Sequence, residues 1–163
     1  MNGALVGEVT EEEIRKALFQ IGSTKAPGPD GFSAVFFQSC WGIIKRDLIR
    51  EVMEFFRDGI LRPDWNKTHI VLVPKTREAS TMAELRPISL CNVSMKVITK
   101  ILANRLQGIL GEVISVHQNA FVKDRMITDN FIIAHEVAHF IRGCKNKKRG
   151  YASIKLDMSK AYD

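Results

Sequence analysis

The chain has 163 residues, of which 45% are hydrophobic and 26% are charged. This length and composition fit one globular domain, since domains cluster around ~100 to 200 residues. No apolar run reaches the ~18 residues of a membrane span, and the N-terminus lacks a secretory signal pattern. We therefore expect an intracellular protein, nuclear or cytoplasmic, that is neither secreted nor membrane-bound.

The net charge and the cysteine content narrow the class of protein further. Lys and Arg number 24 against 18 Asp and Glu, which gives a net charge of +6. A positive net charge favours polyanionic partners such as nucleic acid without requiring one. The cysteines Cys40, Cys91 and Cys144 are odd in number and far apart, which is typical of reduced thiols rather than disulfides.

The N-terminal part predicts a helix followed by a sharply bent loop. Thr10 and Glu13 have the spacing of a capping box, so a helix should begin there. Apolar residues recur at helical spacing up to position 21, and Gly22 is a plausible stop. The stretch 23–34 (STKAPGPDGFSA) then combines two prolines with two glycines, which disfavour regular structure.

The middle of the chain predicts two helices and a strand. Apolar periodicity over 32–60 indicates two helices joined near Trp41 and Gly42. The β-branched run THIVLVP, from Thr68 to Pro74, predicts a buried strand. The polar stretch 75–87 that follows predicts a loop or a hairpin tip.

Two more helices and a closing strand are expected after that. Residues 94–110 carry an apolar helical face, and a third long helix, capped by Thr128 or Asp129, should run to Ile141. A basic stretch follows, for which a solvated loop and a phosphate contact are both open, with basic residues at 142, 145, 147, 148 and 149. The alternation over 152–158 then predicts a strand that displays Asp157 on its polar face. Since we find no repeat or linker, the chain should form one α+β unit, rich in helices with a few strands.

The order of several motifs resembles a known family. From the N-terminus they are KAPGPDGF, HIVLVPK, LRPISLCNV, KVITKILANRL, HQNAFVKDR with ITDN, and IKLDMSKAYD. Together they resemble the reverse transcriptases of non-LTR (LINE-type) retrotransposons, especially those of plants. The resemblance implies one partial domain over 1–163 of a right-hand polymerase, with fingers at about 10–149 and the start of the palm at about 150–163.

The resemblance also implies an activity. The family is an RNA-directed DNA polymerase that uses Mg²⁺, an RNA template, a DNA primer and deoxynucleoside triphosphates. Nucleotidyl transfer by two metals needs carboxylates that converge on ions ~4 Å apart. Asp157 resembles the first such carboxylate, and the backbone carbonyl of Met158 is the second metal ligand that we expect from this segment. Tyr162 resembles the aromatic residue beneath the incoming sugar.

A second carboxylate element of the family does not occur in this sequence. The family carries an aromatic-x-Asp-Asp hairpin, and the 163 residues contain no Asp-Asp pair. Asp163 more plausibly caps or solvates the next element than replaces that pair. The interpretation is therefore a polymerase fragment that is inactive alone, and the oligomeric state stays open.

Other site residues follow from the same resemblance. Lys75 and Arg86 resemble the finger residues that bind the triphosphate, for which an ammonium and a guanidinium are suited. Lys25 in the APGPDG turn, with Gln118 and Arg125 further along, resembles the residues on the template side.

The template-side segment departs from the family pattern before Arg125. Lys123 and Asp124 stand where a turn of small residues is expected.

Two alternatives remain open at this point. One is a non-catalytic remnant that binds nucleic acid through its basic residues. The other is a zinc metalloprotease, because His135, Glu136 and His139 form the sequence H-E-x-x-H on an expected helix. No His or Glu follows His139 to supply a third ligand, so zinc is not expected.

Overall fold

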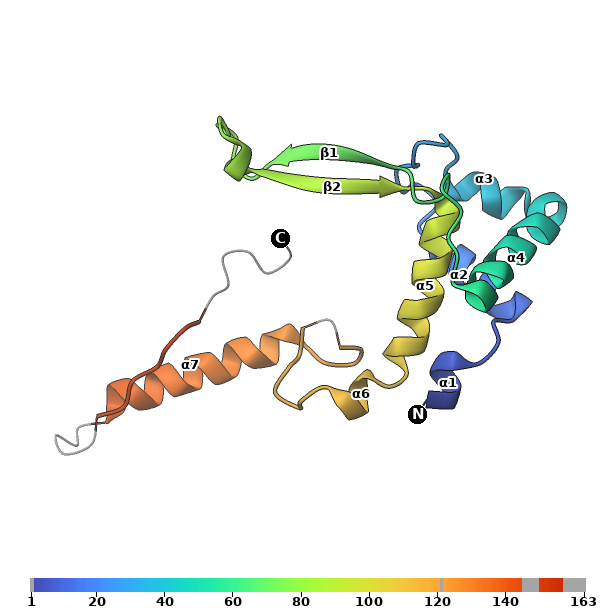
Figure 1. Ribbon diagram of the computed structural model, residues 1–163. Coiled ribbons are helices and arrows are strands. Elements are labelled where there is room, and N and C mark those ends of the chain that lie inside the picture. Colours follow the sequence, from blue (N-terminus) through green and yellow to red (C-terminus); the bar gives the residue numbers. More distant parts are fainter. Residues whose placement is uncertain (1, 121, 145–149, 157–163) are drawn as a thin grey trace. The chain divides into compact units, whose positions relative to one another are not determined.

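The computed structural model describes residues 2–120, 122–144 and 150–156 (Figure 1). The chain divides into two compact units, residues 1–109 and 110–163. Helices dominate, with one two-stranded antiparallel sheet among the described residues, so the predicted α+β class is confirmed. The prediction of one partial domain, with a boundary near residue 150, stays a prediction.

The first unit contains most of the regular structure. Its elements are α1 (Asn2–Val6), α2 (Glu11–Gln20), α3 (Ala34–Ser39), α4 (Trp41–Asp58), β1 (Thr68–Pro74), the short 3₁₀ helix η1 (Met82–Glu84), β2 (Leu85–Cys91) and α5 (Val93–Gln107). The second unit contains α6 (Leu110–Val113) and α7 (Ile127–Gly143).

The core of the first unit lies between α2, α4 and α5. Its fully buried side chains come from all three helices: Ile14 and Leu18 of α2, Val52 of α4, and Val97, Ile98 and Ile101 of α5. The helical periodicity of each segment brings these residues onto one face, where they pack together.

The predicted capping box begins α2. The Thr10 hydroxyl accepts a hydrogen bond from the Glu13 amide at 3.2 Å, and the Thr10 amide donates to the Glu13 carboxylate at 3.3 Å. The helix ends at Gln20, two residues before the expected stop at Gly22. The two helices predicted over 32–60 are also present, and the chain breaks between them at Cys40, beside the predicted junction.

Arg105 joins the N-terminal segment to the end of α5. Its guanidinium binds both carboxylate oxygens of Glu13, at 2.9 and 2.8 Å. It also donates to the carbonyls of Leu5, Gly7 and Glu8. The Arg105 side chain is only 9% exposed, so this bidentate pair is shielded on the arginine side. The hydrogen bonds from Arg105 hold the pKa of Glu13 below its ordinary value of 4.5.

The strand predicted over 68–74 is confirmed, but its predicted burial is wrong. β1 pairs with β2 in an antiparallel ribbon that runs from Thr68 opposite Cys91 to Pro74 opposite Leu85. Ile70 is 66% exposed and Leu72 is 44% exposed. Figure 1 shows the ribbon extending away from the helices of its unit. Among the described residues of its own unit no helix packs along either face, so no helix of that unit buries the apolar side chains.

The second unit departs from the sequence prediction at the start of α7 and in the segment 150–156. The helix begins at Ile127, and its N-cap is Met126, without a side-chain capping bond. The predicted cap at Thr128 or Asp129 is therefore wrong by two or three residues. The segment 150–156 is not a strand, because a strand needs a partner and no described residue pairs with it.

A buried asparagine connects α7 to the loop before it. Asn119 is 8% exposed, and its side chain donates to that of Asn130 at 3.0 Å. The apolar side chains Ile133, Val137 and Phe140 of α7 are exposed. Across the ranges that the structure describes, no helix is long and apolar enough to span a membrane.

The Glu13–Arg105 pair predicts a pH-dependent contribution to stability. Because folding lowers the pKa of Glu13, the ionised carboxylate stabilises the fold above pH 4.5. This contribution is lost as the pH falls from 4.5 through the lower folded value. We expect Glu13→Gln to lower the free energy of unfolding by about 1 kcal/mol at pH 7, a modest value because the Glu13 side chain is 36% exposed. Urea unfolding at several pH values measures the difference.

Glu11→Gln is the matched control for this experiment, since Glu11 contacts only Lys45 at 3.5 Å in an exposed pair. Its effect should stay below about 0.5 kcal/mol at every pH. A Glu13→Gln effect that remained constant from neutral to acidic pH would contradict the assignment.

Candidate functional site

The β ribbon brings Lys75 and Arg86 to the same face. Arg86 lies opposite Val73 in the register. Pairing continues one step beyond the strands, where the Lys75 amide donates to the Glu84 carbonyl at 2.8 Å. Since side chains alternate along a strand, Lys75 lies on the same face as Val73 and Arg86. The two cations are therefore diagonal neighbours near the tip of the hairpin.

Both cations are accessible to a ligand. The Lys75 ammonium donates to the exposed carbonyl of Ala83 at 2.8 Å, which holds it at the tip. The Arg86 side chain is exposed, and no hydrogen bond or ion pair ties it to another residue that the structure describes. A ligand with several anionic oxygens could bind the two groups without breaking an ion pair.

Glu84 organises the hairpin tip instead of neutralising these cations. Its carboxylate accepts hydrogen bonds from the amides of Ser80 at 2.8 Å and Thr81 at 3.0 Å. These backbone donors lower the pKa of Glu84, so it stays ionised near neutral pH. The Glu84 oxygen that accepts these bonds points at the turn, so the Glu84 carboxylate stabilises the hairpin tip.

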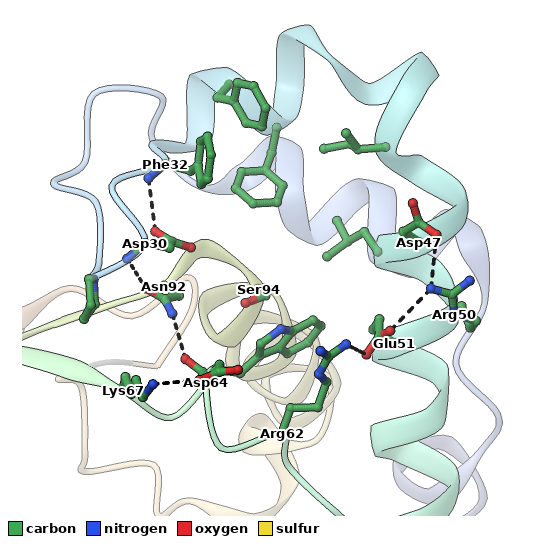
Figure 2. Close-up of a pocket in the computed structure, with 16 residues that line it drawn as sticks. Asp30, Phe32, Asp47, Arg50, Glu51, Arg62, Asp64, Lys67, Asn92 and Ser94 are labelled. Atoms are coloured by element: carbon green, nitrogen blue, oxygen red, sulfur yellow. Dashed lines mark hydrogen bonds and ion pairs between the residues drawn. The ribbon is translucent and has the colours of Figure 1, made fainter.

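The APGPDG turn is held against the start of α5 by Asn92. Asn92 is buried, with 5% of the residue exposed, and its side-chain oxygen accepts a hydrogen bond from the Asp30 amide at 3.2 Å. Its nitrogen donates to the Asp64 carbonyl at 3.1 Å. Figure 2 shows Asn92 between Asp30 and Asp64. One side chain thus connects the turn, the 61–67 segment and the junction of β2 with α5.

Two further contacts fix the same turn. Lys96 of α5 donates from its ammonium to the Ala26 carbonyl at 2.7 Å. Gly28 packs so closely that a Cβ placed there would collide with the side-chain oxygen and the backbone nitrogen of Asn92. Only glycine allows this approach. The neighbouring Lys25 remains exposed, so its ammonium is presented on a loop that is held in place.

Asn92 lies within the LRPISLCNV motif, and the sequence alone assigns it no role. Its position between a strand and a helix suggests an N-cap. In the structure Asn92 is the N-cap residue of α5, yet its side chain makes no capping bond because it reaches other segments. Those partners are 62 and 28 residues away in the sequence, so no local pattern could identify them.

In the second unit, Arg125 closes the loop that contains Gln118. The Arg125 guanidinium donates to the carbonyls of Ser115 at 2.6 Å, Gln118 at 2.7 Å and Ile114 at 3.4 Å. Asp124 before it has a φ of +63°, the left-handed conformation for which small residues are usual. Asp is among the residues that tolerate it, which explains the departure noted at Lys123 and Asp124. Gln118 is exposed.

The remaining predicted site residues lie outside the described residues. These are Asp157, Met158 and Tyr162, together with Asp163 and the basic residues at 145–149. Their predicted roles stay predictions.

The H-E-x-x-H sequence lies on α7, where His135, Glu136 and His139 are all exposed. Over 2–120, 122–144 and 150–156, no group of three or more His, Cys, Asp or Glu side chains could hold a metal ion. The zinc metalloprotease alternative therefore gains no support.

Comparison with known proteins agrees with the family that the order of motifs resembles. The family model described as reverse transcriptase (RNA-dependent DNA polymerase) matches residues 73–163, more than half of the chain. The chain is 32% identical over 155 residues to an uncharacterised 149 kDa protein of transposon TX1 from Xenopus laevis. It is 28% identical over 160 residues to a retrovirus-related Pol polyprotein of the type-2 retrotransposable element R2DM from Drosophila melanogaster. Each match covers 95% of this chain, which spans only 12% and 14% of those two proteins.

The Asn92 contacts predict a large effect of a small substitution. Asn92→Ala leaves the Asp30 amide and the Asp64 carbonyl without their partner, which should lower the free energy of unfolding by about 1 to 3 kcal/mol. Asn104→Ala on the same helix is the control, since it removes only one exposed hydrogen bond, to Gln20. Its cost should be below about 0.5 kcal/mol. Equal midpoints for the two variants in urea would show that Asn92 does not hold the junction.

Proposed function

The chain belongs to the reverse transcriptase (RNA-dependent DNA polymerase) family, and on that basis we propose that its β ribbon binds the triphosphate of an incoming deoxynucleotide. The accessible pair of Lys75 and Arg86, on one face of the ribbon, carries this proposal. Both residues lie within the segment 73–163 that the family model matches. The resemblance to non-LTR retrotransposon proteins is confirmed by the two relatives.

The two cations suit different parts of a triphosphate. A guanidinium presents several N–H donors in a plane and can bind two phosphate oxygens at once, whereas an ammonium acts as a compact point charge. Arg86 would orient one phosphoryl group, and Lys75 would neutralise a second from the hairpin tip. Since Glu84 is held by the tip amides, it competes weakly for either cation.

We propose that the segment after residue 156 supplies ligands for the metal ions that act on the primer hydroxyl and the triphosphate. Asp157 and the backbone carbonyl of Met158 are oxygen ligands of the kind that Mg²⁺ prefers. Bound Mg²⁺ would neutralise triphosphate charge and favour ionisation of the primer hydroxyl. Tyr162 would lie beneath the incoming sugar and exclude a 2′-hydroxyl by contact. The chain contains no Asp-Asp pair to complete such a site, so we expect it to bind nucleotide without extending a primer.

Each unit has residues that could contact a template. Lys25 is exposed beside the fixed APGPDG turn, and Gln118 and Arg125 belong to a loop closed by the Arg125 guanidinium. We propose that these residues contact the backbone of an RNA template paired to a DNA primer, which the net charge of +6 favours. Because these partners are intracellular, we place the protein in the nucleus or the cytoplasm.

Nucleotide binding by charge variants tests the proposal. Fluorescence anisotropy of a labelled deoxynucleoside triphosphate with Mg²⁺ should show affinity 5- to 30-fold weaker for Lys75→Gln and for Arg86→Gln, which corresponds to about 1 to 2 kcal/mol for each charged contact. Arg77→Gln is the matched control, because it makes the same change in charge on the same exposed hairpin. The control should retain most of the affinity.

The outcome that contradicts the proposal is equal weakening by all three variants. That result would mean that the nucleotide responds to net charge and not to the two cations that share a face of the ribbon.

A further inference from the structure

A cavity of about 670 Å³ lies in the first unit, away from Lys75 and Arg86 (Figure 2). It is lined by residues of α3 and α4, by the segment 61–67 and by the start of α5. Ligand cavities of small molecules typically measure ~300 to 1,000 Å³ and combine apolar walls with a few polar groups. The cavity has the size and the composition of such a site.

Aromatic side chains form one wall of the cavity. Phe32 and Phe36 lie 4.7 Å apart between ring centres with a tilt of 32°, and Phe37 meets both edge-on. Trp65 lines the cavity as well, together with the aliphatic side chains of Ile44 and Leu48. Phe32 is 47% exposed and Phe36 is 38% exposed, although both border the cavity. A flat apolar group would bury this surface against further rings.

The Ser94 hydroxyl is an unpaired donor at the cavity, where α5 begins. Ser94 is 5% exposed and lines the cavity, but no described residue forms a hydrogen bond with its hydroxyl. Figure 2 shows Ser94 between Phe32 and Arg62. Since no fully buried side-chain polar atom of the described residues lacks a partner, this hydroxyl is open to the cavity, where a ligand oxygen could accept its hydrogen bond.

The backbone amides in the first turn of α5 also lack hydrogen-bond acceptors in the part of the chain that the structure describes. The side chain of Asn92 is occupied by Asp30 and Asp64, so it does not cap α5. The first amide with a helical partner is that of Lys96, which donates to the Asn92 carbonyl at 3.1 Å. Within the described residues, the amides of Val93 to Met95 have no hydrogen-bond acceptor. A helix N-terminus of this kind attracts an acceptor oxygen.

The charges around the cavity disfavour a highly charged ligand. Arg62 pairs with Glu51 at 2.6 Å, Arg50 with Asp47 at 3.1 Å, and Lys67 with Asp64 at 2.7 Å. Asp30 accepts from the Phe32 amide and completes a lining of four carboxylates and three cations. No cation is left over to bind a polyphosphate or a nucleic-acid backbone. The lining therefore favours an apolar ligand with a single acceptor group.

We propose that this cavity binds a small aromatic molecule whose carbonyl or carboxylate oxygen accepts hydrogen bonds from the Ser94 hydroxyl and the first-turn amides of α5. The rings of Phe32, Phe36 and Trp65 would contact the aromatic body. The proposal is independent of nucleotide binding, because the cavity shares no residue with the Lys75 and Arg86 pair.

Titration of the ¹⁵N-labelled chain, observed by NMR, tests the proposal with three probes: benzamide, benzoate and inorganic phosphate. Benzamide and benzoate should shift the amides of Val93, Ser94 and Met95 and the indole of Trp65 in a saturable manner. Inorganic phosphate should not. Ser94→Ala should weaken both aromatic probes about 3- to 10-fold, the usual effect of losing one hydrogen bond. Ser89→Ala, on the exposed ribbon, should leave them unchanged.

A second measurement separates binding from folding. Because the Ser94 hydroxyl has no partner in the unliganded chain, the urea midpoint of Ser94→Ala should equal that of the unmodified chain. A clearly lower midpoint would show that the hydroxyl serves the fold and would overturn the proposal. The absence of shifts with both aromatic probes, equal shifts with phosphate, or unchanged affinity in Ser94→Ala would overturn it as well.

Discussion

The arrangement of the first unit depends on one buried amide side chain, that of Asn92. It accepts from the Asp30 amide and donates to the Asp64 carbonyl, so it joins three segments that are far apart in the sequence. An amide is suited to this role because it offers an acceptor and a donor on the same small group. Gly28 completes the junction by allowing the turn to approach Asn92 without a side chain between them.

The same amide has consequences for both proposed sites. Asn92 holds the APGPDG turn and follows the end of β2 directly. It therefore positions the end of the ribbon that joins α5, and through the ribbon the Lys75 and Arg86 side chains near the hairpin tip. Because its side chain is used in this way, the first turn of α5 is left without a cap. At the other end of α5, Arg105 binds Glu13 and the N-terminal carbonyls. Helix α5 therefore carries a polar junction at each end and apolar core residues between them.

Local sequence signals predicted local structure well. The capping box at Thr10 and Glu13 involves residues three apart, so its spacing alone could reveal it. The break between α3 and α4 and the strand β1 followed from patterns of the same range. The motif order also identified the family, which the family model and both relatives confirm.

Features that depend on distant partners were not predictable in this way. The run THIVLVP is a strand, but whether a strand is buried depends on what packs against it, which its own sequence does not contain. The segment 150–156 alternates like a strand, yet pairing requires a neighbour. The role of Asn92 escaped prediction for the same reason. Of the predicted site residues, the structure brings Lys75 and Arg86 to one face, whereas Asp157 lies outside the described residues.

Hydrogen exchange at the Asp30 amide tests most directly whether Asn92 holds the APGPDG turn on α5. In the unmodified chain this amide should exchange slowly, because it donates to the Asn92 side chain. In Asn92→Ala its exchange should accelerate strongly, while the Ile14 amide, bonded to the Thr10 carbonyl at the start of α2, keeps its protection. Equal exchange of the Asp30 amide in the two proteins would contradict the account.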